Sequence, residues 1–216
     1  MSNCALSSSH ENDVFINCPF DQRYTALIRP LLFTVLYVGC TPRLASERFN
    51  SGEERLGKIC ELIQSSRLSI HDISRAKSEK KGEILRMNMP FELGIDFGCR
   101  LFGGNDKRNK VFLVLEREKH ACDKALSDFS GMDVKNHNDN PEELVREVRN
   151  WFVENGMASN RVPATRIWDD FNEFMADFYT RRKNEGFNDK DLQMMPIPEY
   201  IDFTRAWLSA WTPATK

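Results

Sequence analysis

The feature that most constrains the fold is the regular alternation, between residues 13 and 155, of short apolar runs with longer amphipathic segments. The short runs are rich in Val, Ile, Leu and Phe, and their length of roughly five residues is that of buried β-strands. The predicted strands lie at residues 13–17, 40–45, 67–72, 111–115 and 130–134. Pro42 places the second strand near an edge of the sheet, because proline has no N–H to donate to a neighbouring strand.

The amphipathic segments between these strands have apolar residues at helical spacing. The predicted helices cover residues 24–38, 51–63, 88–101 and 140–155. Asn140 followed by Pro141 is a typical helix start. Because each parallel crossover needs a helix, the order predicts an α/β domain over residues 13–160, with an open parallel sheet of about five strands and helices on both faces.

Three segments lie outside this pattern. Residues 161–216 contain no further strand, but two apolar stripes predict a C-terminal helical extension that packs on the domain or on a partner subunit. These stripes consist of Trp168, Phe171, Phe174, Met175 and Phe178, and of Tyr200, Phe203, Trp207 and Trp211. Residues 1–12 lack the features of a secretory signal and are predicted to be a flexible leader. The heavily charged residues 75–86 are predicted to form an exposed loop.

Composition and motifs exclude several classes of protein. The chain has 30 Lys and Arg residues against 32 Asp and Glu residues and a formal net charge of -2, so no global charge favours nucleic acid or anionic membrane. The apolar stretch at residues 31–40 is about half as long as a membrane span. The sequence has no Gly-x-Gly-x-x-Gly, no phosphate-binding P-loop and no Gly-x-Ser-x-Gly motif. Its six cysteines lack C-x-x-C spacing, which predicts reduced thiols in the cytoplasm and no metal site.

In open parallel sheets, ligands bind at the carboxyl ends of the strands. This rule selects residues 17–21, 72–75 and 88–92 as the candidate site. Glu92 is the best candidate for chemistry, because the helix dipole favours its carboxylate while burial against Pro90 and Phe91 would raise its pKa. Asp96 follows four residues later on the same helical face, and such pairing of like charges has a cost.

Each of these acidic residues also has a simpler interpretation. Glu92 would only complement the helix dipole, and Asp21 would cap the helix that follows it. Asp72 would accept hydrogen bonds either from a ligand hydroxyl or from local backbone amides. The basic residues of the loop at 75–86 would clamp phosphates or form a solvated surface.

Three motifs together resemble a known family. They are Asp13-Val-Phe-Ile-Asn-Cys-Pro-Phe-Asp21, Ser69-Ile-His-Asp-Ile-Ser74 and Met89-Pro-Phe-Glu-Leu-Gly94. In this order they resemble the TIR-like and nucleoside 2-deoxyribosyltransferase-like group of prokaryotic proteins, over about residues 13 to 155. The resemblance implies a flavodoxin-like sheet and cleavage or exchange of the bond between a ribose carbon and a base nitrogen, in NAD or in nucleosides.

The resemblance also implies roles for individual residues. Glu92 matches the essential glutamate of the family, and Asp72 matches its substrate-contacting aspartate, which would orient ribose hydroxyls. The side chains that would hold the base and exclude water are Phe15, Pro19, Phe20 and Phe91. The other candidate substrate-binding residues at these positions are Asp21, Ser74, Asn88 and Asp96. His71, the loop at 75–86 and the helical extension depart from the family pattern and leave the substrate open.

The resulting expectation is an N-ribosyl hydrolase or transferase in prokaryotic anti-phage defence, with NAD or a nucleotide as substrate rather than cofactor. A homo-oligomer or a defence-system partner protein, bound through the C-terminal helices, is expected as well. Two alternatives remain. One is a nucleotide-sensing module without catalysis, in which the extension passes the signal to a partner. The other is an oligomerising adaptor in which Trp207 and Trp211 form the contact.

Overall fold

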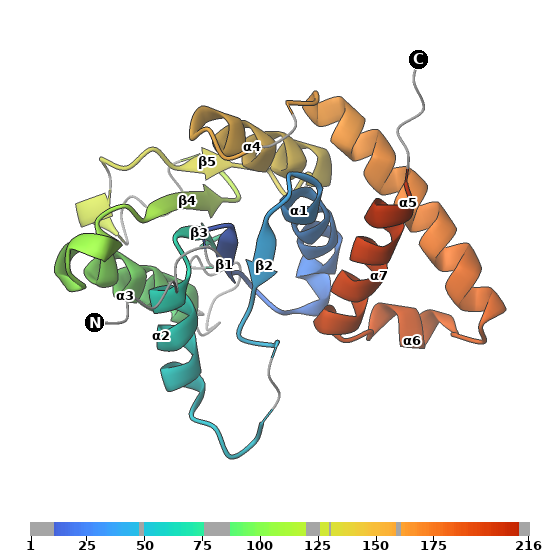
Figure 1. Ribbon diagram of the computed structural model, residues 1–216, viewed down its shortest axis with the longest axis horizontal. Helices are drawn as coiled ribbons and strands as arrows, with labels where there is room; N and C mark the ends of the chain where they lie inside the picture. Colours follow the sequence, from blue (N-terminus) through green and yellow to red (C-terminus); the bar gives the residue numbers. More distant parts are fainter. Residues whose placement is uncertain are drawn as a thin grey trace, which may run out of the picture.

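The computed structural model describes residues 11–47, 50–75, 87–119, 126–129, 131–158 and 161–211. It contains one parallel sheet with the strand order β2-β1-β3-β4-β5, which is the flavodoxin-like α/β order (Figure 1). The strands are β1 (Asp13–Asn17), β2 (Thr41–Arg43), β3 (Leu68–Asp72), β4 (Val111–Glu116) and β5 (Lys135–Asn136). The predicted fold class is therefore confirmed, and β2, with Pro42, lies at an edge as expected.

Seven α-helices and three short 3-10 helices connect and cover the strands within the described residues. The α-helices are α1 (Thr25–Tyr37), α2 (Arg55–Ser65), α3 (Asn88–Phe102), α4 (Pro141–Glu154), α5 (Ala164–Asn184), α6 (Asp189–Gln193) and α7 (Ile197–Ala210). The 3-10 helices are η1 (Gln22–Tyr24), η2 (Asn105–Lys107) and η3 (Ser127–Phe129).

Alternate residues of each strand point to opposite faces of the sheet, and this sorts the helices into two layers. Val14 and Ile16 of β1 belong to the core that α1 and α4 cover, whereas Phe15 packs against α2 on the other face. The chain leaves β1 for β2 on one side and returns to β3 on the other. The carboxyl ends of β1 and β3, where Asn17 pairs with His71, therefore form the switch point at which such sheets bind ligands.

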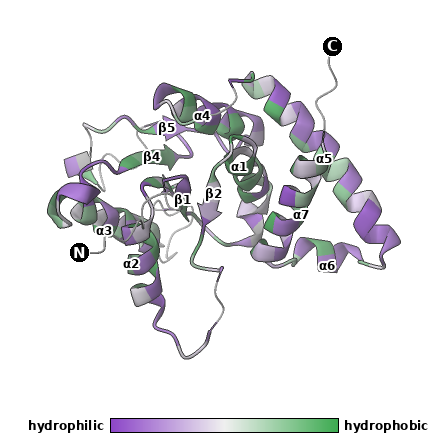
Figure 2. Cartoon of the chain, viewed as in Figure 1, coloured by the Kyte–Doolittle hydropathy of each residue, from purple (hydrophilic) through white to green (hydrophobic). Residues whose placement is uncertain are grey.

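The C-terminal extension packs on the domain. Phe33 of α1 contacts Phe171 and Phe174 of α5, at 5.5 and 5.4 Å between ring centroids, and Trp207 of α7 at 6.1 Å. Helix α1 is mostly hydrophobic, because it is covered by the sheet on one side and by the extension on the other, whereas α5 is mostly hydrophilic (Figure 2). The aromatic stripes of the sequence are thus largely used inside this chain.

Several local predictions need correction. The fifth strand covers residues 135–136, not 130–134. Helix α2 begins at Arg55, so the acidic residues before it lie outside its first turn. Asn140 caps α4 as predicted, because its side chain accepts hydrogen bonds from the backbone N–H groups of Glu142 and Glu143. The leader before residue 11 and the basic loop at 76–86 lie outside the described residues.

None of the helices in the described parts of the chain is long and apolar enough to cross a membrane.

Gly94 lies on the exposed side of α3, and a Cβ at this position would have no heavy atom within 4 Å. Because glycine costs about 1 kcal/mol relative to alanine inside a helix, Gly94→Ala is expected to raise the free energy of unfolding by about that amount. Urea denaturation measures this difference. A loss of stability would show that the side of α3 carrying Gly94 packs against another part of the chain.

Candidate functional site

At the carboxyl end of β3, Asp72 is completely buried and accepts four hydrogen bonds. The backbone N–H of Ser74 donates at 2.9 Å, and its hydroxyl donates to the same carboxylate oxygen. The other oxygen accepts from the Tyr24 hydroxyl and from His137 Nε2, the latter at 3.0 Å. Burial alone would raise the pKa of Asp72, but the hydrogen bonds from His137, Ser74 and Tyr24 hold this pKa below its ordinary value.

A tight turn after β5 orients the His137 ring. The backbone N–H of Asp139 donates to His137 Nδ1 at 3.1 Å, so the ring proton must lie on Nε2, which faces Asp72 and the Ser74 hydroxyl. Asn138 and Asp139 both adopt positive φ, at 51° and 55°, and Asn and Asp tolerate this conformation better than most residues. The turn therefore directs the Nε2–H of His137 toward a buried carboxylate.

Asp96 lies on the other face of the sheet in a second buried network. It accepts hydrogen bonds from the Ser69 hydroxyl at 2.5 Å and from His71 Nε2 at 3.0 Å, and it pairs with Lys110 Nζ at 3.1 Å. The side-chain amide of Asn17 donates to His71 Nδ1 at 3.1 Å, which places the ring proton on the nitrogen that faces Asp96. Burial would raise the pKa of Asp96, but His71, Lys110 and Ser69 lower it.

Lys110 ties this network to the end of α2. Its ammonium group also donates to the backbone carbonyls of Ile63, at 2.7 Å, and of Ser66. Lys110 therefore neutralises a buried carboxylate and satisfies two carbonyls at a helix end. Glu92 and Asp96 lie four residues apart on the same face of α3. Because Lys110 neutralises Asp96, this face does not carry two uncompensated negative charges.

Glu92 differs from both aspartates. Its side chain is 7% exposed, yet no hydrogen bond or ion pair to another described residue reaches its carboxylate. Burial raises the pKa of Glu92 to about 6, although the charge of Arg55 opposes the shift. Burial of a carboxylate that accepts no hydrogen bond from the described residues costs stability.

Three of the predicted acidic residues surround Cys18, the residue that follows β1. Burial raises the pKa of its thiol, and the nearby charges of Asp72, Glu92 and Asp21 raise it further. These carboxylates therefore lie near the residue that follows β1. The same effects keep Cys18 protonated and make it a poor nucleophile.

The remaining predicted residues fall into two groups. Phe15, at 1% exposure, packs with α2 and contacts the His71 ring edge-on at 5.9 Å, so it belongs to the core beneath the site, as Asp96 does. Phe20 and Phe91 are 44% and 58% exposed. Asn88, the first residue of α3, is exposed as well.

Pro19, Phe20 and Asp21 line a cavity of about 700 Å³ that lies between α1 and the segment around α6 and α7. Asp21 also accepts a hydrogen bond from the Tyr24 N–H at 3.1 Å, as the capping interpretation predicted. The extension thus closes a cavity against the loop that was expected to hold the base.

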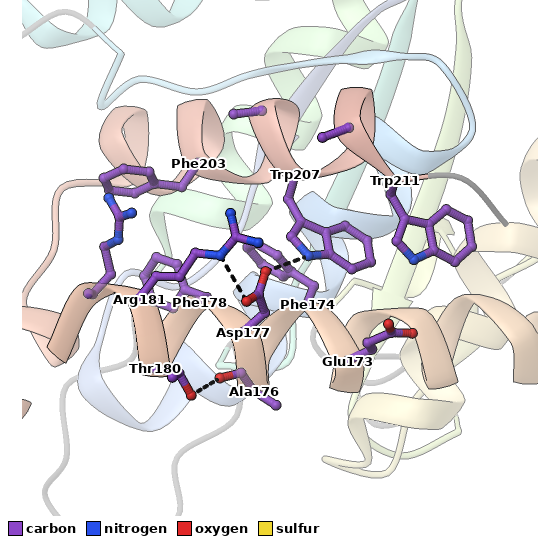
Figure 3. Close-up of a pocket in the computed structure, with 13 residues that line it drawn as sticks. Glu173, Phe174, Ala176, Asp177, Phe178, Thr180, Arg181, Phe203, Trp207 and Trp211 are labelled. Carbon is purple, nitrogen blue, oxygen red and sulfur yellow. Dashed lines mark hydrogen bonds and ion pairs between the residues drawn. The ribbon is translucent and has the colours of Figure 1, made fainter. Parts of the chain in front are cut away.

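A second hollow, of about 680 Å³, runs between α5 and α7 (Figure 3). Trp207 and Trp211 stack at 5.5 Å along it. The Trp207 indole N–H donates to Asp177 at 3.1 Å, and Arg181 donates to the same carboxylate at 2.8 Å. These intramolecular contacts already use part of the surface predicted for an oligomer contact.

Tyr24 and His137 were not identified from the sequence. They bond Asp72 across 48 and 65 positions, a separation that no local pattern reveals. His137 directly follows β5. Had the sequence placed that strand correctly, His137 would have been predicted at the carboxyl ends of the strands, together with the other candidate residues. Among the described residues, no group of three or more His, Cys, Asp or Glu side chains is arranged to hold a metal ion.

Comparison of the chain with models of known protein families, with curated proteins and with solved structures found no match. The likeness of its motifs to the TIR-like and deoxyribosyltransferase-like group therefore remains a prediction.

Replacing Lys110 would leave Asp96 as an unpaired buried charge. Lys110→Met is expected to lower the free energy of unfolding by about 3–5 kcal/mol. The double variant Lys110→Met/Asp96→Leu removes both charges and should recover a large part of this loss. Chemical denaturation compares the three proteins, and a double variant less stable than the single one would show that Asp96 contributes apart from Lys110.

Glu92→Gln is expected to stabilise the protein at neutral pH. The folded-state pKa of about 6 exceeds the ordinary value of 4.5, so the stability of the wild-type protein is complete below pH 4.5 and falls as pH rises through 6. The difference corresponds to about 2 kcal/mol. Denaturation at several pH values should show this advantage of Glu92→Gln at pH 7.5 and its disappearance near pH 4, whereas Glu154→Gln, at an exposed position, should show neither.

Proposed function

We propose that the protein is an N-ribosyl hydrolase or transferase that breaks the bond between the ribose anomeric carbon and the base nitrogen of NAD or a nucleotide, with Glu92 as its catalytic carboxylate. The observation that carries the proposal is that Glu92, near the residue that follows β1, is 7% exposed and accepts no hydrogen bond from any described residue. Asp72, by contrast, accepts four hydrogen bonds, and Asp96 accepts two and pairs with Lys110.

The chemistry requires a carboxylate of this kind. Cleavage of the ribose–base bond passes through an oxocarbenium-like state, and a nearby carboxylate either attacks the anomeric carbon or stabilises its positive charge. With a pKa of about 6, Glu92 is mostly ionised at pH 7.5. Since no donor among the described residues competes for its oxygens, the charge is available to the substrate.

The Asp72 cluster would support this step without touching the substrate. Its carboxylate is completely buried and already accepts four hydrogen bonds, so it cannot orient a ribose hydroxyl directly. Asp72 instead fixes Ser74 and Tyr24 at the carboxyl end of β3. Of the two roles considered for Asp72, acceptance from local groups is the one that its surroundings favour. Anti-phage defence rests on the motif resemblance alone.

The direct test is to incubate the purified protein with NAD and a panel of nucleosides and nucleotides and to measure the released base by liquid chromatography. Glu92→Gln is expected to lower the rate by at least about 100-fold, whereas Glu154→Gln should retain it. For the wild-type protein, kcat/KM should fall as pH drops below about 6, because Glu92 then becomes protonated. Equal activity of Glu92→Gln and wild type would contradict the role of Glu92. An acceptor base in the mixture separates transfer from hydrolysis.

A nucleotide-sensing module without catalysis is the second candidate. It is favoured by the 700 Å³ cavity, because this cavity joins the β1–α1 loop to the C-terminal extension. Thermal stabilisation by a nucleotide, without release of base at any protein concentration, would support this function instead.

A further inference from the structure

The cavity between the domain and its extension has the properties of a separate ligand site. Three parts of the chain that are distant in sequence form it: the loop after β1, the buried side of α1, and the segment from α6 to the start of α7. Its volume of about 700 Å³ lies in the range of small-molecule sites, which often occur where two structural units meet.

The walls of this cavity are mainly apolar. Phe20, from the loop after β1, and Met194, which follows α6, both line it, and they are 44% and 70% exposed. Ile28, Leu32, Met195 and Ile197 add further apolar surface. Large apolar side chains that face a cavity rather than the core are typical of binding sites.

The charges around the cavity favour an anion. The acidic side chain in its wall, Asp21, is already engaged by the Tyr24 N–H at 3.1 Å and by Arg75 at 3.9 Å. Arg29 is also occupied, because its guanidinium donates to the Leu192 carbonyl and thereby holds α6 against α1. Lys190 lines the cavity, is exposed, and has no hydrogen bond or ion pair from its side chain within the described part of the chain.

The start of α7 adds to this preference. Ile197, its first residue, lines the cavity. Pro198 in this first turn has no N–H, so Ile197 and Glu199 supply the N–H groups that have no acceptor within the helix, and the helix dipole is positive at this end. Although the Glu199 carboxylate adds a negative charge to the turn, a negative group placed between Lys190 and Ile197 would meet a cation and a helix-terminal N–H donor.

We propose that this cavity binds a small aromatic molecule that carries an anionic group. The aromatic part lies against Phe20 and Met194, and the anionic group lies at Lys190 and the start of α7. The site is separate from the chemistry of Glu92, but the two share the loop after β1, because Cys18 borders Glu92 and Phe20 lines the cavity. A ligand here would therefore contact the loop that forms one side of the candidate active site.

The test uses 1-anilinonaphthalene-8-sulfonate, an aromatic sulfonate whose fluorescence rises in apolar surroundings. Titration of the full chain should give saturable binding. Lys190→Glu and Met194→Glu each place a negative charge in the cavity and should weaken this binding at least about fivefold. Both positions are exposed, so the melting temperatures of these variants should remain close to that of the wild type.

Two matched variants serve as controls. Arg205→Glu makes the same change of charge on α7 outside the cavity, and Phe102→Glu replaces an apolar residue that is 86% exposed on α3. Both should bind the probe like the wild type. The proposal is overturned if the wild type does not bind the probe, or if Lys190→Glu and Met194→Glu bind it unchanged, as they would if the probe occupied the hollow between α5 and α7. Glu92→Gln should bind it normally, so failure of the catalytic proposal and failure of this one are distinguishable.

Discussion

The structure depends on how buried carboxylates are satisfied around the central strand β3. Asp96 is neutralised by Lys110 and held by His71 and Ser69, and this network joins α3, the sheet and the end of α2. Asp72 is held by donors from three separate parts of the chain. Unpaired charges inside a protein cost several kcal/mol, so these two networks fix the strand and its neighbouring helices in a single arrangement.

The C-terminal extension covers the outer side of α1 and forms a cavity with the loop after β1. In an open α/β sheet, α1 would present its outer side to solvent, but here Phe33 of α1 contacts the aromatic residues of α5 and α7. Arg29 of α1 holds α6 in place through the Leu192 carbonyl. As a result, the loop after β1 lies between two regions, the carboxylate cluster at the sheet edge and the cavity formed with the extension.

Sequence patterns predicted the parts of the fold that short segments determine. The strands around Ile16, Ile70 and Leu113 and the capped start of α4 follow from local periodicity and from Asn140. β5 has two residues and only partly buried side chains, so no periodicity marks it. Helical spacing correctly placed Glu92 and Asp96 on one face of α3, and the structure shows that both are buried. It could not separate their environments, because Lys110 reaches Asp96 from outside the helix and sequence spacing does not reveal that contact.

The contrast between Glu92 and Asp96 separates the structural role of Asp96 from the catalytic role proposed for Glu92. Both are acidic residues buried on the same face of α3, and folding alone would favour an uncharged residue at either position. At Asp96 the fold supplies a cation and two hydrogen-bond donors, so the charge holds elements together. At Glu92 the described residues supply neither, and burial raises the pKa of its carboxyl. Residues that reduce stability in this way concentrate at functional sites, where activity offsets the loss. A ligand that brings positive charge or hydroxyl groups to Glu92 would provide the interactions that the fold omits.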